Sequence, residues 1–256
     1  MNHEKVLAAF DRELRRQARP DGPETRVERA GDVVRQVGPE HAWNGVIWSD
    51  LDARRADAAI AEQVRYFGAL KRSFEWKLYG HDRPADLDRR LLAAGFTAEP
   101  AETVMVGETA DAGRWAFEVP PGVDLVPVTD RDGVELAAAV HERVFGTARD
   151  QVRARLLDLL GAGELYAVLA MAGGTPISAA RLELHPGTRF AGLWGGGTVP
   201  EWRGRGVYRA LIAYRAREAA ARGYDFLQVD ASSQSRPILL RLGFEALTTT
   251  TPYVHP

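Results

Sequence analysis

One segment in the second half of the chain restricts its fold more than any other. Over 195–211 it reads Gly-Gly-Gly-Thr-Val-Pro-Glu-Trp-Arg-Gly-Arg-Gly-Val-Tyr-Arg-Ala-Leu. We expect a strand that ends at Val199, then a loop rich in glycine and arginine, then a helix over Gly206–Arg222 whose apolar residues recur at helical spacing. A strand, a loop and a helix in direct succession are typical of an α/β fold.

The expected loop has the chemistry of an anion-binding site. The first turn of a helix has unpaired N–H groups and the positive end of the helix dipole, and small residues before it let an anion approach the backbone. Arg203, Arg205 and Arg209 add formal charge, so the sequence predicts a cradle for a pyrophosphate. It is not a Walker loop, because no Gly-Lys-Ser/Thr follows. It is not a dinucleotide fingerprint, because Arg209 stands where the third glycine is needed.

The spacing Arg-x-x-Gly-x-(Gly/Ala) from Arg203, with Tyr208 in its last position, resembles the CoA-binding motif of the GCN5-related N-acetyltransferase (GNAT) family. The expected order of strands and helices from Val123 to Tyr253 also resembles that family. The alternative is an arginine-rich turn on an ordinary α/β domain. The resemblance implies acetyl-CoA as cosubstrate, with the pantetheine arm along the strand before the loop. It assigns cofactor binding to Thr198, Val199, Arg203, Gly204, Arg205, Gly206, Val207, Tyr208 and Arg209.

The three glycines 195–197 precede this motif. We expect them to mark a bulge where the strand separates from its neighbour and opens the acetyl site. The alternative is a flexible or tightly packed strand end.

The segment from Asp230 to Phe244 departs from the family. Many relatives have a tyrosine five residues before the phenylalanine, whose phenol protonates the departing thiolate, and this chain has Leu239 there. Thiolate is a good leaving group, and general acid catalysis contributes only ~10²–10⁴-fold, so transfer is still expected. Glu183 and Asp230 are the candidate bases, with His185 as another, and for each the alternative is an ion-paired or solvated group. No cysteine is present, which leaves direct attack in a ternary complex.

The first half has expected strands over Val27–Val37 and Gly45–Trp48 and a helix over 52–70, but no loop of glycine and arginine. Its segment Leu91–Phe96 repeats the pattern of Leu239–Phe244, which favours a degenerate duplication over a common helix ending. The predicted fold is α/β (α+β), two GNAT-like domains in tandem, with a mixed central sheet flanked by helices. Residues 1–110 are expected to form a truncated GNAT-like domain without the CoA loop, 111–121 the linker, and 122–256 the acyltransferase domain.

Composition limits the partners. The net charge of −2 gives no reason to expect nucleic acid or a membrane surface, and the apolar stretch over 165–180 is broken by Gly173, Gly174 and Pro176. None of the six histidines has a metal-ligand spacing, so no metal is expected. The lack of cysteine and of an apolar leader fits the cytoplasm. The sequence leaves a homodimer open and does not disclose the acceptor amine.

The predicted function is acyl-CoA-dependent N-acylation of an amine on a small molecule or peptide. Because Leu239 replaces the usual acid, the alternative is a non-catalytic acyl-CoA-binding sensor or interaction protein. A purely structural α/β protein is the third hypothesis, and it predicts no CoA binding at all.

Overall fold

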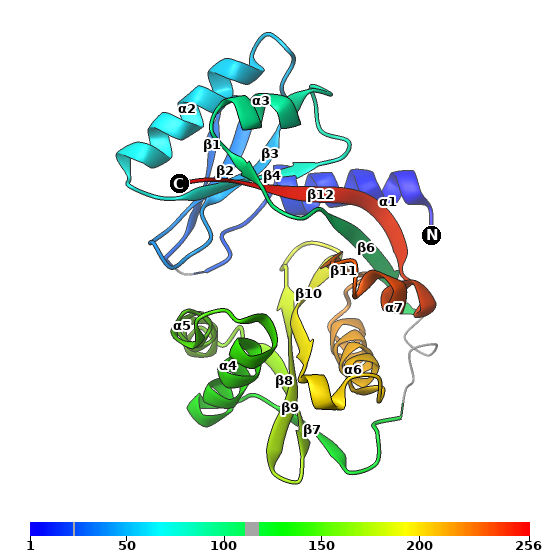
Figure 1. Ribbon diagram of the computed structural model, residues 1–256. Coiled ribbons are helices and arrows are strands. Elements are labelled where there is room, and N and C mark those ends of the chain that lie inside the picture. Colours follow the sequence, from blue (N-terminus) through cyan, green and yellow to red (C-terminus); the bar gives the residue numbers. More distant parts are fainter. Residues whose placement is uncertain (23, 111–117) are drawn as a thin grey trace. The chain divides into compact units, whose positions relative to one another are not determined.

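The structure, a computed structural model, describes residues 1–22, 24–110 and 118–256 (Figure 1). These residues form two compact units. The first unit comprises Met1–Met105, Asp230–Arg241 and Glu245–Pro256. The second comprises Val106–Val229 and Leu242–Phe244. Strand β6 (Glu102–Glu108) contains the boundary between them.

The first unit is built on a mixed sheet. Its strands β3 and β4 are parallel, and the other neighbouring strands pair antiparallel. In order they are β1 (Arg26–Ala30), β2 (Val33–Val37), β3 (Gly45–Ser49), β4 (Phe74–Tyr79) and β12 (Glu245–His255), and the short β5 (Thr97–Ala98) also pairs with β12. The single strand expected over 27–37 was wrong, because a turn at Gly31–Asp32 folds it into the β1–β2 hairpin.

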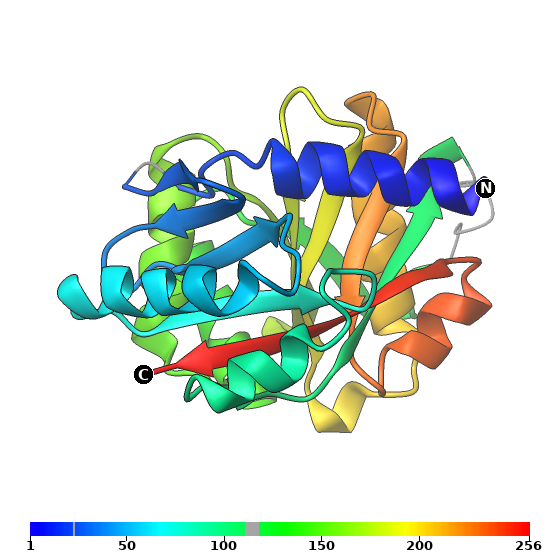
Figure 2. The same cartoon turned by 90° about the horizontal axis from the view of Figure 1, so that it is seen from above.

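Helices cover both faces of this sheet. Helices α2 (Ala56–Ala69) and α3 (Leu87–Ala93) enclose a core around Trp76. Since side chains alternate along a strand, Tyr79 points to the opposite face, where its ring packs 5.7 Å from that of Phe10. Phe10 ends α1 (His3–Phe10), which runs on without a break into the π-helical segment η1 (Asp11–Arg16) (Figure 2).

The second unit contains the predicted motif on a second mixed sheet. The strands run in the order β11 (Phe226–Ala231), β10 (Phe190–Thr198), β9 (Thr175–Leu184), β8 (Tyr166–Ala172) and β7 (Val123–Pro127). In it, β10 and β11 pair parallel, and the three pairs from β10 to β7 are antiparallel. Helices α4 (Arg131–Phe145) and α5 (Arg149–Gly161) lie on one face and α6 (Val207–Ala221) on the other (Figure 1). Val168 and Ala170 accordingly join the α6 core, and Leu169 joins the core under α4 and α5.

The predicted fold class, α/β with a mixed sheet flanked by helices, is confirmed. The strand, loop and helix expected around Gly206 are also present. The final strand β12 pairs with β4 of the first unit, and α7 (Arg236–Arg241) belongs to that unit as well. Residues 111–117 of the predicted linker lie outside the described residues, so the boundaries at 110 and 122 stay predictions.

Candidate acyl-CoA site

The triple glycine forms a bulge in β10. Trp194 lies opposite Arg181 and Gly197 opposite Ala179, so Gly195 and Gly196 together face the single residue Ala180. Gly195 adopts a left-handed conformation with φ of 57°, which favours glycine at the first position of a bulge. The predicted bulge is therefore confirmed.

Next to the bulge, β10 separates from β11. The parallel pairing covers Phe190–Gly192 against Phe226–Gln228, and the next pair along, Leu193 and Val229, is not part of it. Towards β9 the backbone of β10 stays paired as far as Val199, whose N–H donates to Ile177 at 2.9 Å. Among the described residues, the register between β10 and β11 therefore ends at Gly192.

The loop that follows leads directly into the start of a helix. After a short 3₁₀ turn over Pro200–Trp202, Gly206 takes φ 89° and ψ −6° and precedes α6. The N-cap residue is Gly206, so no side-chain hydrogen bond of the N-cap residue closes this first turn. The sequence assigned a pyrophosphate to this helix start, on the N–H groups of Arg205 to Arg209.

The arginines of the loop have distinct surroundings. Arg203 donates from Nε to the carbonyl oxygen of Thr198 at 3.0 Å, which ties the loop to the end of β10. The guanidinium of Arg205 lies over the ring of Trp202, 4.8 Å from its centroid. A Cβ built on Gly206 would lie 3.5 Å from Nη2 of Arg209, so this side chain folds back over the helix start. All three arginines are exposed.

We expect Gly197→Ala to destabilise the protein by about 1–3 kcal/mol, because overpacking strains a filled core. A Cβ at Gly197 would lie 2.6 Å from Cγ1 of Val144 and 2.8 Å from Cε2 of Phe145, both on α4. Chemical denaturation measures the free energy of unfolding. Gly161→Ala is the control, since a Cβ at Gly161 on α5 meets nothing within 4 Å. Equal free energies for both variants would contradict this tight packing.

The candidate base Glu183 is held by a cation. Arg181 donates from Nη2 to Oε1 of Glu183 at 2.7 Å. Burial raises the pKa of Glu183, but the charges of Arg181, His185 and Arg155 and the hydrogen bond from Arg181 together outweigh it and leave the pKa below its ordinary value. Burial also lowers the pKa of His185 against the opposing charge of Glu183. At neutral pH this strand end therefore presents a carboxylate next to a neutral imidazole.

The other candidate base, Asp230, lies in the first unit, where its carboxylate forms an ion pair with Lys77 of β4. Burial alone would lower the pKa of Lys77. The charges of Asp230, Tyr79 and Glu75 and the hydrogen bond to Asp230 together outweigh it and raise that pKa above its ordinary value. Glu183 and Asp230 thus each have a cation within hydrogen-bond distance. Their roles as proton acceptors stay predictions. Leu239, in the expected tyrosine position, is fully buried.

Sequence reasoning missed one charged residue of this unit. Arg215 lies on the face of α6 that also carries Val207 and Leu211, and only 2% of its surface is exposed. Its Nη1 donates to the carbonyl oxygen of Arg181 at 3.0 Å. The signal that could have revealed it is an arginine four residues after Leu211, on the apolar face of an amphipathic helix.

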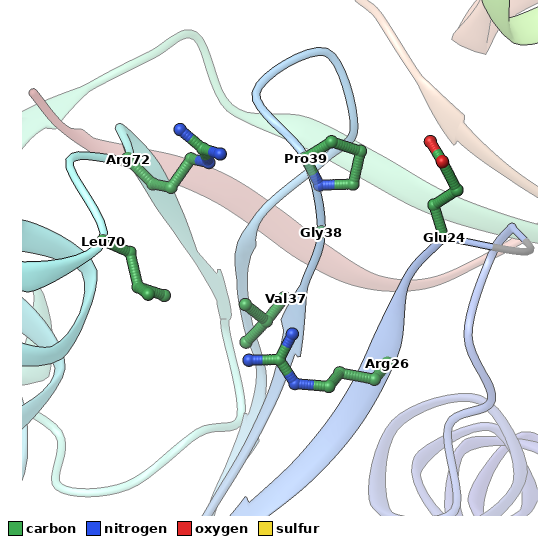
Figure 3. Close-up of a pocket in the computed structure, with 7 residues that line it drawn as sticks. All are labelled: Glu24, Arg26, Val37, Gly38, Pro39, Leu70 and Arg72. Carbon is green, nitrogen blue, oxygen red and sulfur yellow. The ribbon is translucent and has the colours of Figure 1, made fainter.

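Other features of the described residues add no further chemistry. A pocket of about 350 Å³ in the first unit is lined by Glu24, Arg26, Val37, Gly38, Pro39, Leu70 and Arg72 (Figure 3). Its Arg26 already pairs with Glu28 at 2.7 Å. Within the described residues no three His, Asp or Glu side chains gather to hold a metal, and no helix there has the length and apolar character needed to cross a membrane.

The second unit thus has a bulged strand that leads through an arginine-rich loop into α6. Residues 134–244 match the model of the acetyltransferase (GNAT) family. Over these residues the chain is similar to a GNAT acetyltransferase domain. None of the curated proteins compared with the chain gave a match.

Solved structures are similar to the whole chain. A GCN5-related N-acetyltransferase from Kribbella flavida is 20% identical with a TM-score of 0.73, covering 100% of this chain and 96% of that one. A functionally unknown conserved protein from Staphylococcus epidermidis is 12% identical with a TM-score of 0.71, covering 93% and 96%. A tandem GNAT protein from the clavulanic acid biosynthesis pathway is 15% identical with a TM-score of 0.64, covering 99% and 95%. At these identities the likeness concerns the fold, and it includes a tandem GNAT fold.

Proposed function

We propose that the protein transfers an acetyl group, or another short acyl group, from CoA to an amine of a small molecule or peptide. The observation that carries the proposal is the start of α6 after Gly206, together with the end of the register between β10 and β11 at Gly192. An anionic pyrophosphate fits the N–H groups of Val207 to Arg209 and the charges of the loop. The pantetheine arm has amide groups that can pair with β10 beyond that register.

Direct attack of the amine on the thioester follows from the composition, because the chain has no cysteine to form a thioester with the enzyme. The amine must lose a proton as the amide forms. Glu183 and Asp230 are the proposed acceptors, and the neutral imidazole of His185 next to Glu183 is a further one. We assign the reaction to the cytoplasm on the lack of cysteine.

The second candidate function, a sensor that binds acyl-CoA without turnover, rests on Leu239 in place of the phenol. Calorimetric titration of acetyl-CoA into the protein, followed by a screen of amine acceptors for release of free CoA, separates the two. We expect saturable binding and turnover with at least one amine. Binding without turnover across the screen would favour the sensor. Absence of binding to the folded protein would refute both functions and leave the fold alone.

A further inference from the structure

Tyr208 replaces the small residue of the CoA motif and contacts the bulge. It is the second residue of α6, and a Cβ built on Gly196 would lie 3.1 Å from its Cε2. The ring therefore covers the side of Gly196 that faces α6. Gly196 lies two residues after Trp194, which is the last residue of β10 paired with β9 before the bulge. Tyr208 is half-buried, so part of its surface reaches solvent.

A buried cation meets the same glycine. Arg215 is two turns further along α6, and its Nη2 would lie 3.4 Å from the same Cβ at Gly196. Its guanidinium donates to two backbone carbonyl oxygens, those of Leu211 at 3.1 Å and Arg181 at 3.0 Å. No carboxylate among the described residues pairs with it. A buried positive charge without a counter-ion is costly, and an anion that forms nearby would reduce the cost.

Arg215 and Tyr208 have the protonation states that this role requires, a cation to stabilise an anion and a phenol to give it a proton. Burial lowers the pKa of Arg215 to about 10, so the guanidinium is still a cation at neutral pH. Burial raises the pKa of Tyr208, and the charge of Arg215 opposes that increase, so the phenol retains its proton. The sulfur of CoA becomes an anion in acyl transfer, and the sequence has no tyrosine in the position where the family has its acid.

We propose that Tyr208 is the catalytic acid that protonates the CoA thiolate, next to the positive charge of Arg215. The proposal rests on the acyl transfer proposed above and names its proton donor. The amine nitrogen forms a bond to the thioester carbon, the carbon–sulfur bond breaks, and its electron pair goes to sulfur. The phenol gives its proton to that sulfur, the nitrogen loses one proton to the acceptor proposed above, and proton exchange with solvent then returns the phenolate and the acceptor to their starting states.

A thiol titration tests this without any acceptor amine. Because the protein has no cysteine, the ultraviolet absorbance of thiolate in its complex with CoA reports the CoA sulfur alone. The same protein saturated with desulfo-CoA, which lacks the sulfur, serves as the blank. Subtracting its absorbance removes the contribution of the ionised tyrosines. A hydrogen bond from Tyr208 stabilises the thiolate, so Tyr208→Phe is expected to raise the pKa of the bound thiol by about one unit. Phenylalanine keeps the ring against Gly196.

Tyr214→Phe is the matched control, since it removes a phenol from the same helix outside the contact with Gly196. It is expected to leave the thiol pKa unchanged. With an acceptor from the screen, Tyr208→Phe is expected to lower kcat by ~10²-fold at saturating acetyl-CoA without loss of affinity.

Two results would overturn the proposal. One is a Tyr208→Phe variant that still binds CoA and leaves the pKa of the bound thiol unchanged. The other is weaker binding of CoA with an unchanged rate at saturation, which would make Tyr208 a binding residue only. If the wild type binds no CoA, the proposed function itself fails, and the titration shows this before any variant is compared.

Discussion

Arg15→Met is expected to lower the free energy of unfolding by about 3–5 kcal/mol, since it leaves a carboxylate buried without its cation. Arg15 is the second-last residue of the helical segment α1–η1 and is 1% exposed. Its Nη2 donates to both oxygens of Asp82, at 2.7 and 2.8 Å, and its Nη1 donates to Asp11 at 2.6 Å. The Asp82 side chain is 5% exposed, so water cannot replace the lost partner.

Denaturant unfolding at neutral pH measures this effect, and Arg12→Met is the control. Arg12 lies in the same segment and pairs with Glu13, but its side chain is 51% exposed, so its loss is expected to cost less than about 1 kcal/mol. If both variants unfold at the same denaturant concentration, the buried network contributes nothing beyond a surface ion pair.

The same network predicts a pH dependence for the wild type. Burial raises the pKa of Asp11, but the hydrogen bonds from His81 and Arg15 and the charges of both groups together outweigh it and keep the pKa below its ordinary value. A depressed carboxyl pKa contributes stability above the unfolded-state pKa, and this is lost as the pH falls through the folded value. The difference between wild type and Arg15→Met is therefore expected to shrink in acid.

The parts of the site that could be predicted are those in which neighbouring residues determine the backbone conformation. The run of glycines before the loop predicted the bulge in β10, and Gly206 before an apolar helix predicted the start of α6. Both depend on residues a few positions apart, because bulges and helix starts are determined by which residues tolerate unusual dihedral angles. The family resemblance added the cofactor to this geometry.

The parts that could not be predicted depend on residues far apart in the sequence. Pairing of β12 with β4 joins Tyr253 to Trp76, and nothing in either segment specifies that partner. Local patterns also cannot show that Lys77 neutralises Asp230, which changes how a candidate base is judged. The same holds for Tyr208 and Arg215, which both lie against Gly196 of the bulge. Such contacts give a role to a side chain, such as that of Tyr208, that the motif alone leaves unspecified.

Gly206→Glu is expected to weaken acetyl-CoA binding by on the order of 100-fold or more, because like charges placed together cost several kcal/mol and each 1.4 kcal/mol is tenfold. A Cβ at Gly206 would lie 3.5 Å from Nη2 of Arg209 and 3.9 Å from Cγ of Pro120, both ordinary contacts. The new carboxylate therefore fits next to Arg209. The carboxylate would repel the pyrophosphate, and it would neutralise the Arg209 charge that otherwise attracts the pyrophosphate.

Gly223→Glu separates this electrostatic effect from backbone strain. Gly223 follows the other end of α6 with φ of 79°, close to the 89° of Gly206, and a Cβ there meets nothing within 4 Å. Both variants thus place the same side chain on a left-handed backbone at an end of one helix. Calorimetry is expected to give wild-type affinity for Gly223→Glu alone. Equal affinities in both variants would place the pyrophosphate away from Gly206, and equal losses in both would assign the effect to strain in α6 rather than to charge at its start.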